Sequence, residues 1–401
     1  MPEGLPESSR RPAAPSVGDY YSAVQLRADR WSALRVAVDR LAHLGPEDAD
    51  AAAPARRAEE LFEALNPIEM YWAFPGLSAF DHMRRQLDHR NWEDLAFSVR
   101  RVVRALTSGA YRRRTIPLAR DDGDAEDIED EATLPIEARA LARPYFEVLL
   151  VDDLGEHQER WLRSSLARMR RNEDAFVYEP VVVPSLEDAL IGILFNHNIQ
   201  AVVVRPGLVL KSRNTLTILT KHLNRIGDED LDALAPEDYG TALCRLIARV
   251  RPELDAYLIT DRSVEEIAGR DLGGCRRVFY NQEDFLELHL NILRGVSARH
   301  KTPFFTALKE YSKQPTGVFH AMPISRGKSI SKSHWIQDMG AFYGPNIFLA
   351  ETSATSGGLD SLLEPHGTIK EAQELAARAF GAKQTFFATN GTSTCNKIVV
   401  Q

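Results

Sequence analysis

Apolar residues recur at helical spacing through the first hundred positions. Between Tyr20 and Leu106, leucine, valine and tryptophan side chains lie three or four residues apart, which places them on one face of an α-helix. The pattern predicts a helical region over residues 19–115. An aromatic run, Tyr71–Gly76, interrupts it. We favour core and loop packing for this run over a surface that docks a partner.

From residue 143 the pattern changes to short runs of β-branched residues. A helix is expected from about Glu156 to Arg171. The runs that predict strands are Phe146–Val151, Val181–Val183, Ala201–Val204, Ala256–Ile259 and Val278–Tyr280. Strands that alternate with helices are joined by right-handed crossovers into a parallel sheet. The fold class is therefore α/β, with a small doubly wound, flavodoxin-like domain over residues 143–285.

The last hundred residues combine helices with long irregular segments. A helix is expected from Thr368, where Thr368 and Glu371 have the spacing of a capping box and Gly381 provides the stop. Gln384–Ala388 predicts a buried strand behind it. Irregular backbone rich in glycine and serine, such as that between Phe342 and Leu363, is typical of a site or an interface.

A hydroxyl-rich turn follows the predicted strand. Gly391, Thr392, Ser393 and Thr394 lead into a further helix, so unpaired backbone N–H groups, hydroxyl groups and the positive end of a helix dipole would face one anion. A phosphate group fits there. Serine and threonine also cap helices without any ligand, and the residues alone do not separate the two interpretations. The GxxxxGK[ST] arrangement of Walker-type nucleotide sites is absent from this turn.

Composition narrows the class of protein. The 401 residues contain 57 acidic and 49 basic side chains, for a net charge of −8, which disfavours a role in coating nucleic acids. Three cysteines without a CxxC pair indicate neither a disulfide framework nor a zinc site, and we expect no metal. Without a secretion signal or an apolar run of roughly 18 residues, we expect a cytoplasmic protein with no membrane partner.

Two polar segments separate these regions. Residues 1–18 mix proline, serine and arginine without periodicity and predict a disordered arm. Residues 116–142 include Asp121–Glu131, where acidic side chains dominate. Like-charge repulsion resists compaction there, so we favour a solvated linker over an acidic segment that binds a metal or a partner.

The first predicted strand ends in an acidic pair, Asp152 and Asp153. The pair resembles the one in receiver domains of response regulators, where it helps to hold Mg²⁺ beside a phosphate-accepting aspartate at the end of the third strand. Here Arg205 stands at that place, and a guanidinium group cannot accept phosphate. We predict no phosphorylation switch and interpret the acidic pair as a remnant or as partners of a helix end.

Four motifs in fixed order resemble the bacterial ornithine/lysine/arginine decarboxylases. They are Phe342–Asn346, Leu359–Leu363, Ile369–Gln373 and Thr389–Thr394. Those enzymes belong to fold type I and depend on pyridoxal 5'-phosphate, with a receiver-like wing domain before the cofactor domain. The resemblance implies a wing domain over residues 143–285, then a linker helix and an incomplete cofactor domain over residues 286–401. It also implies decarboxylation of ornithine, lysine or arginine to the corresponding amine by a homodimer or higher homo-oligomer.

The resemblance assigns the cofactor phosphate to the turn at 391–394. In the family the Schiff-base lysine, the aspartate beside the pyridine nitrogen and the ring-stacking histidine follow that turn. We therefore expect the catalytic residues beyond Gln401 and expect the 401-residue chain to be inactive. Lys397 lies on the helix of the turn itself, and Ser297–Lys301 precedes the turn. We interpret neither as the source of the Schiff-base lysine.

Two departures from the family pattern concern substrate choice. Ile324 and Ser325 replace a Gly-His pair, and Asp360 replaces a glycine. Which basic amino acid is the substrate therefore stays open. Two other classes also stay open: a non-catalytic regulatory or assembly homologue, and another fold type I enzyme such as an aminotransferase. A Ser-x-His-Lys sequence downstream would favour the decarboxylase.

Overall fold

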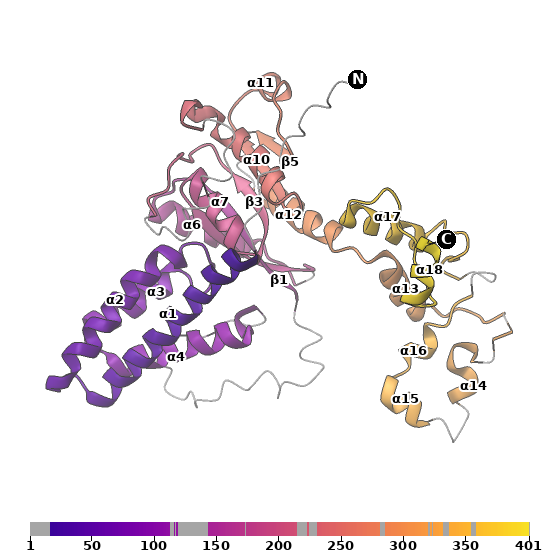
Figure 1. Cartoon of the computed structure of the whole chain (residues 1–401), viewed down its shortest axis with the longest axis horizontal. Helices are drawn as coiled ribbons and strands as arrows, with labels where there is room; N and C mark the ends of the chain where they lie inside the picture. Colours follow the sequence, from indigo (N-terminus) through magenta and orange to yellow (C-terminus); the bar gives the residue numbers. More distant parts are fainter. Residues whose placement is uncertain are drawn as a thin grey trace. The chain divides into compact units, whose positions relative to one another are not determined.

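The chain divides into two compact units, Met1–Ser297 and Ala298–Gln401, and each is described by itself (Figure 1). The computed structural model describes residues 17–112, 116, 118, 143–172, 174–214, 223, 231–280, 285–319, 321–322, 324–331, 337–353 and 358–400. Most of the predicted acidic linker, except residues 116 and 118, and most of the predicted N-terminal arm lie outside these ranges. The finer division into a helical region, a wing domain and a cofactor domain stays a prediction.

Four helices form the N-terminal part of the first unit. They are α1 (Val17–Leu44), α2 (Ala52–Glu69), α3 (Leu77–Asp88) and α4 (Trp92–Ser108), with the short helices η1 (Ala49–Ala51) and η2 (Ala110–Arg112). Figure 1 shows α1 alongside α2 and α4. Trp31, Phe62 and Phe80 are buried in their common core, and removing this apolar surface from water stabilises the packing. The helical spacing correctly predicted this region.

A five-stranded parallel sheet forms the rest of the first unit. Its strands are β1 (Tyr145–Val151), β2 (Val177–Val183), β3 (Ile199–Val204), β4 (Asp255–Thr260) and β5 (Cys275–Tyr280). Their order is β2-β1-β3-β4-β5 and all neighbours are parallel, which is the flavodoxin-like order. The prediction of an α/β fold with five such strands is confirmed.

Helices cover both faces of this sheet, as a parallel sheet requires. On one face α6 (Glu156–Arg168) and α12 (Phe285–Arg299) pack against Val148 and Leu150. On the other face α7 (Leu186–Phe195) and α10 (Tyr239–Val250) pack against Leu149 and Val202. The shorter helices η4 (Leu231–Ala233), η5 (Pro236–Asp238) and α11 (Val264–Ala268) complete the connections.

The aromatic run after α2 joins the helices to the sheet. Tyr71 is fully buried, and its hydroxyl group donates to Asp188 Oδ1 at 2.8 Å. Asn196 Nδ2 donates to the carbonyl of Tyr71 and to Glu147 Oε2, both at 2.6 Å. Core packing of the run is thereby confirmed, and Tyr71 and Trp72 are not available to dock a partner.

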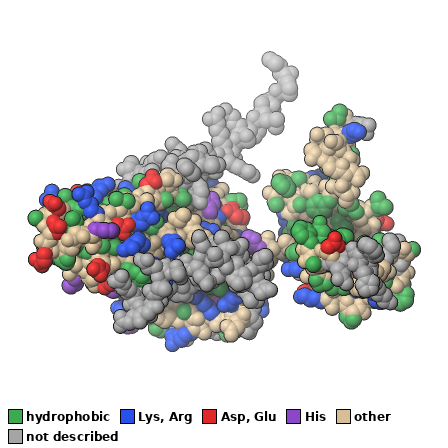
Figure 2. All heavy atoms as spheres, turned by 90° about the horizontal axis from the view of Figure 1, so that it is seen from below, with side chains coloured by type: hydrophobic (Ala, Val, Ile, Leu, Met, Phe, Trp, Pro, Cys, Tyr) green, Lys and Arg blue, Asp and Glu red, His purple; other side chains and the backbone are tan. Residues whose placement is uncertain are grey.

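The described part of the second unit is helical. Its elements are α13 (Pro303–Lys313), η6 (Ser325–Gly327), α14 (Lys328–Ser331), α15 (Gln337–Tyr343), α16 (Asn346–Leu349), α17 (Thr368–Phe380) and α18 (Thr392–Val400). Figure 2 shows green apolar side chains on its surface. Two of the most exposed apolar residues of the unit are Phe342 and Leu363, which are 80% and 98% exposed. None of the described helices of either unit is long and apolar enough to cross a membrane.

The prediction of a strand at Gln384–Ala388 is wrong. This segment forms no strand, and Phe386 within it is 79% exposed. A β-strand satisfies its backbone through a neighbouring strand, and the described residues of the second unit supply none. Apolar composition alone therefore did not determine the conformation here.

The predicted capping box of α17 is also wrong. The N-cap position is Gly367, no side chain of the helix caps it, and the hydroxyl group of Thr368 is buried without a partner. Glu371 pairs instead with Lys301. The predicted stop is confirmed, because Gly381 ends the helix with φ +63°, a conformation that glycine adopts without strain.

Asp360 caps α17 from outside the helix. Its Oδ2 accepts hydrogen bonds from the N–H groups of Gly367 at 2.9 Å and Ile369 at 2.8 Å, and its Oδ1 accepts from Ser361 at 2.9 Å and His366 at 3.0 Å. Burial raises the pKa of this carboxyl group, but the four backbone donors outweigh burial and lower the pKa to about 2. The ionised carboxylate therefore stabilises the start of the helix.

Arg205 neutralises the acidic pair at the end of β1. Its Nε lies 2.9 Å from Oδ2 of the buried Asp152, and Arg213 lies 3.8 Å from Asp153. Burial raises the pKa of Asp152, while the charge of Arg205 opposes that rise. A Cβ at Gly207 would lie only 2.1 Å from Asp152 Oδ1, so a glycine is needed beside this carboxylate. Asp152 is the partner of a guanidinium group and not of a helix end.

We expect no phosphorylation of this acidic pair. A guanidinium group holds Asp152 where a receiver domain would hold Mg²⁺, and the third strand offers no acceptor. Incubation with acetyl phosphate and Mg²⁺ should leave the intact mass unchanged, for the wild-type chain and for Arg205→Ala alike. A gain of about 80 daltons that maps to Asp152 or Asp153 would contradict the prediction.

Asp360→Asn should weaken the start of α17. Loss of a helix cap costs about 0.5–2 kcal/mol, and the contribution of Asp360 depends on its charge. Because its folded pKa lies below the unfolded value of about 3.9, the stabilisation is complete above that value and is lost as pH falls towards 2. Hydrogen exchange of the α17 amides at pH 7 should therefore be faster in Asp360→Asn. Glu374→Gln on the same helix, at an exposed position, is the control, and equal protection in the two variants would refute the assignment.

Candidate functional site

The predicted phosphate turn lies at the start of α18. Gly391 has φ +78°, and the helix begins at Thr392. The N–H groups of Thr394 and Cys395 bond to the carbonyl of Gly391 at 3.1 and 3.4 Å. The N–H groups of Thr392 and Ser393 thus precede the first hydrogen bonds of the helix.

The hydroxyl groups of this turn differ in whether they are available to donate a hydrogen bond to an anion. Thr392 and Ser393 are exposed, so their hydroxyl groups face solvent. Thr394 Oγ1 donates to the carbonyl of Asn390 at 3.2 Å, which uses its hydrogen within the turn. The structure therefore brings all four predicted residues together, with two hydroxyl donors and the two first N–H groups of the helix available to one ligand.

Two lysines of the second unit lie in environments unsuited to a buried cofactor linkage. Lys397 is exposed on α18. Lys301 is half exposed and forms an ion pair with Glu371 of α17. Neither side chain is enclosed by the residues around it.

Sequence analysis missed Arg326, which organises the irregular part of the second unit. Its buried guanidinium group stacks on the ring of Tyr311, with Cζ 4.7 Å from the ring centroid. It donates to five backbone carbonyls at 3.0–3.3 Å, those of Tyr311, Ser312, Gln314, Thr316 and Leu349. Arg326 and the preceding Ser325 both have φ near +50°. No periodicity in the sequence marks such a residue, because its partners are backbone atoms.

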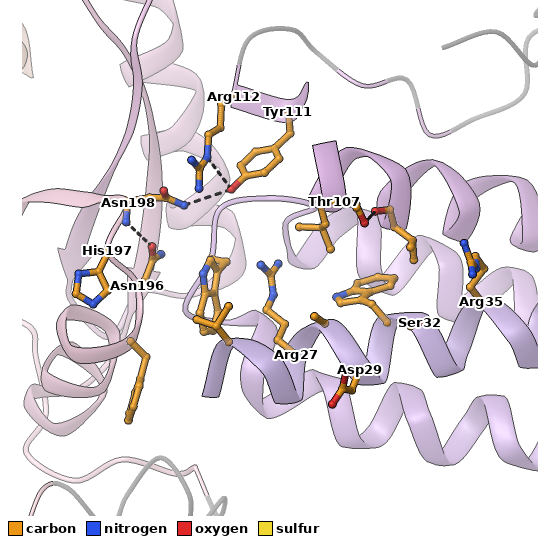
Figure 3. Close-up of a pocket in the computed structure, with 17 residues that line it drawn as sticks. Arg27, Asp29, Ser32, Arg35, Thr107, Tyr111, Arg112, Asn196, His197 and Asn198 are labelled. Carbon is orange, nitrogen blue, oxygen red and sulfur yellow. Dashed lines mark hydrogen bonds between the residues drawn. The ribbon is translucent and has the colours of Figure 1, made fainter. Parts of the chain in front are cut away.

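A cavity of the first unit was also missed by sequence analysis. It has a volume of about 480 Å³ and lies between α1, the end of α4, η2 and the turn 195–198 that joins α7 to β3 (Figure 3). Three arginines line it: Arg27, Arg35 and Arg112. The lining comes from segments far apart in the chain, so no local motif could have indicated it.

A second cavity of about 540 Å³ lies at the carboxyl ends of β3 and β4, where doubly wound folds bind ligands. Its arginines are already paired, Arg205 with Asp152 and Arg262 with Asp238 at 3.2 Å. Its arginines are therefore less available to bind an anionic ligand than unpaired arginines would be. The described residues of the chain contain no cluster of three or more His, Cys, Asp or Glu side chains that could hold a metal ion.

Comparisons with known proteins match part of this chain, including the second unit. Residues 302–401 match the family model "Orn/Lys/Arg decarboxylase, major domain". The chain is 36% identical over 162 residues to the lysine decarboxylase LdcA of Pseudomonas aeruginosa, a match that covers 38% of this chain and 22% of that protein. It is 28% identical over 179 residues to the constitutive ornithine decarboxylase of Escherichia coli, covering 43% and 24% respectively.

These matches are partial. Each covers less than a quarter of the relative's length. The crystal structure of the Francisella novicida lysine decarboxylase LdcF superposes with a TM-score of 0.35 at 20% identity, over 63% of this chain and 32% of that one. The assignment of a family therefore depends on the sequence matches. In these matches, residues 302–401 are similar in sequence to the major domain of the Orn/Lys/Arg decarboxylases.

Proposed function

We propose that the intact protein is a pyridoxal-phosphate-dependent decarboxylase of a basic amino acid. The observation that carries the proposal is the family match over residues 302–401, which includes the turn at 391–394. The turn supports the proposal because its exposed hydroxyl groups and first N–H groups lie at a helix N-terminus, a position that commonly binds phosphate. The substrate class is ornithine, lysine or arginine, and the product is the corresponding amine.

The residues of the turn would hold the cofactor by its phosphate group. The backbone around Gly391 and the N–H groups of Thr392 and Ser393 would donate to phosphate oxygens, and the two exposed hydroxyl groups would add charge-assisted bonds. No acidic residue lies within the segment 389–394 to repel the phosphate. Pyridoxal phosphate supplies the electron sink for the charge that remains when CO₂ leaves.

Asp360 has a structural role in this proposal. Its two oxygens accept five backbone hydrogen bonds, from Ser361 and from the segment 366–370 around the start of α17, so the carboxylate is engaged by the protein itself. We infer that this departure from the family pattern does not select the substrate. The departure at Ile324 and Ser325 adjoins Arg326 and its carbonyl network, and the identity of the basic amino acid remains open.

The first test concerns the phosphate turn. In the intact holoenzyme, Thr392→Ala/Ser393→Ala should weaken pyridoxal phosphate binding by on the order of 10²- to 10⁴-fold, because each hydroxyl donor to an ionised phosphate contributes about 1.5–3 kcal/mol. Titration of the apoenzyme with the cofactor, followed by absorbance, measures this. Thr306→Ala/Ser312→Ala on α13 removes two hydroxyl groups elsewhere in the unit and should leave binding unchanged. Equal affinity in all three proteins would exclude this turn.

The 401-residue chain by itself should not bind the cofactor covalently at one lysine, because Lys301 is ion-paired and Lys397 is exposed. Borohydride reduction in the presence of pyridoxal phosphate, followed by peptide mapping, should give scattered and substoichiometric labelling. Stoichiometric labelling of Lys301 or Lys397 alone would show that this lysine binds the cofactor. The 401-residue chain would then contain a Schiff-base lysine, contrary to our expectation.

We also propose that the intact protein is a homodimer or a higher homo-oligomer. Between Phe319 and Leu363 the second unit exposes large apolar side chains, with Phe319 91% and Tyr343 55% exposed. Exposed apolar surface of this kind is typical of an interface.

Sedimentation of the intact protein should therefore show a dimer or larger species at micromolar concentration, and Leu363→Asp should shift it towards monomer. Val36→Asp introduces the same charge at an exposed apolar position of α1 and should have no effect. A fully active monomer would refute the proposal.

A further inference from the structure

The cavity in Figure 3 has the dimensions of a small-molecule site. Its volume of about 480 Å³ lies within the range of about 300–1,000 Å³ that is typical of ligand pockets. Val24, Val103 and Leu106 supply apolar walls, and polar side chains from α1, η2 and the turn 195–198 face the space between them. All of these elements belong to the first unit, outside residues 302–401 that match the decarboxylase model.

Arg27 presents a fixed donor at the base of this cavity. The side chain is only 8% exposed, and its Nε and Nη2 bind the two oxygens of Glu69 at 2.7 and 2.8 Å. Nη2 also donates to the carbonyl of Phe74 at 2.6 Å, and the guanidinium group lies 4.7 Å from the centroid of the Trp72 ring. Nη1 has no hydrogen-bond partner among the described residues. The ion pair with Glu69 thus holds the Arg27 guanidinium group in place before a ligand binds.

Tyr111 and its neighbours add further donors at the opposite wall. The hydroxyl oxygen of Tyr111 accepts hydrogen bonds from Arg112 Nε at 3.1 Å and Asn198 Nδ2 at 3.3 Å, and Figure 3 shows these three side chains together. Within the described part of the chain, the hydroxyl hydrogen of Tyr111 has no acceptor. This wall therefore offers a ligand hydrogen-bond donors from Tyr111, Arg112 and Asn198.

The charges of the lining favour an anion. Arg35 and Arg112 have no ion-pair partner among the described residues, whereas Glu69 balances Arg27. Asp29 is the single acidic side chain among the described lining residues, and its Oδ1 already accepts from Gln25 at 2.6 Å. The remaining titratable group of the lining is His197, whose pKa is lowered by burial and by the charge of Arg251, so it adds little positive charge at pH 7.

We propose that this cavity binds a small molecule that carries a phosphate group. Guanidinium groups match the geometry of phosphate oxygens, and a phosphate monoester has a charge of about −1.5 to −2 at pH 7. This charge suits Arg35 and Arg112, for which no described acidic side chain forms an ion pair. The cavity is larger than the phosphate group alone, and its apolar walls accommodate the organic part. The site is independent of the turn at 391–394.

Calorimetric titration of the full chain at low ionic strength tests the proposal, with inorganic phosphate, pyrophosphate and adenosine 5'-monophosphate as probes. At least one probe should bind, and Arg35→Ala and Arg112→Ala should each weaken its binding by roughly 10- to 100-fold. Both side chains are exposed, so these variants should fold. Arg84→Ala, at an exposed position of α3, should have no effect.

Two further controls separate this site from other sources of binding. Thr392→Ala/Ser393→Ala should leave the affinity of this cavity for the probe unchanged, because those residues belong to the turn at 391–394 and do not line the cavity. Succinate should bind more weakly than the phosphorylated probes. The proposal fails if no probe binds at millimolar concentration, if succinate binds as tightly, or if Arg35→Ala and Arg112→Ala bind like the wild type.

Discussion

The arrangement of the first unit depends on hydrogen bonds to one buried carboxyl group, that of Glu147 in the interior strand β1. It is fully buried, and burial raises its pKa. A buried polar group without partners costs several kcal/mol. Its partners are Asn196 Nδ2 at 2.6 Å, the hydroxyl group of Tyr145 at 3.1 Å and the N–H group of Ala73 at 3.2 Å. Because Ala73 follows the helix α2 and Asn196 follows α7, these bonds hold the helical part and the sheet in one arrangement, and the arginine-lined cavity lies beside it.

The second unit uses polar side chains in the same way, to satisfy backbone that has no regular partner. Arg326 donates hydrogen bonds to backbone carbonyls of α13, of the segment that follows it and of α16. Asp360 collects N–H groups at the start of α17. In each case one ion replaces the hydrogen bonds that a sheet or a longer helix would provide. Two charged side chains thus organise the irregular backbone of the second unit.

The two binding sites that we propose lie in different units of the chain. The family match and the turn at 391–394, which we propose binds phosphate, both lie in residues 302–401, on a unit rich in exposed apolar side chains. The cavity with Arg27, Arg35 and Arg112 lies in the other unit, outside the residues 302–401 that match the family model. In the flavodoxin-like sheet itself, the place that a receiver domain uses for Mg²⁺ is filled by the ion pair of Asp152 and Arg205.

The sequence by itself determined the helices of the first hundred residues, the five strands and their parallel arrangement, because hydrophobic periodicity records which side of each element is buried. It also placed the turn at 391–394 and the stop at Gly381, since both follow from local backbone geometry. Only the tertiary structure decided the rest. Gln384–Ala388 is not a strand because no described neighbour pairs with it, and α17 is capped by Asp360 because a carboxylate eight residues before the helix reaches its first N–H groups. The cavity depends on α1 and on the turn 195–198, which only the folded chain brings together.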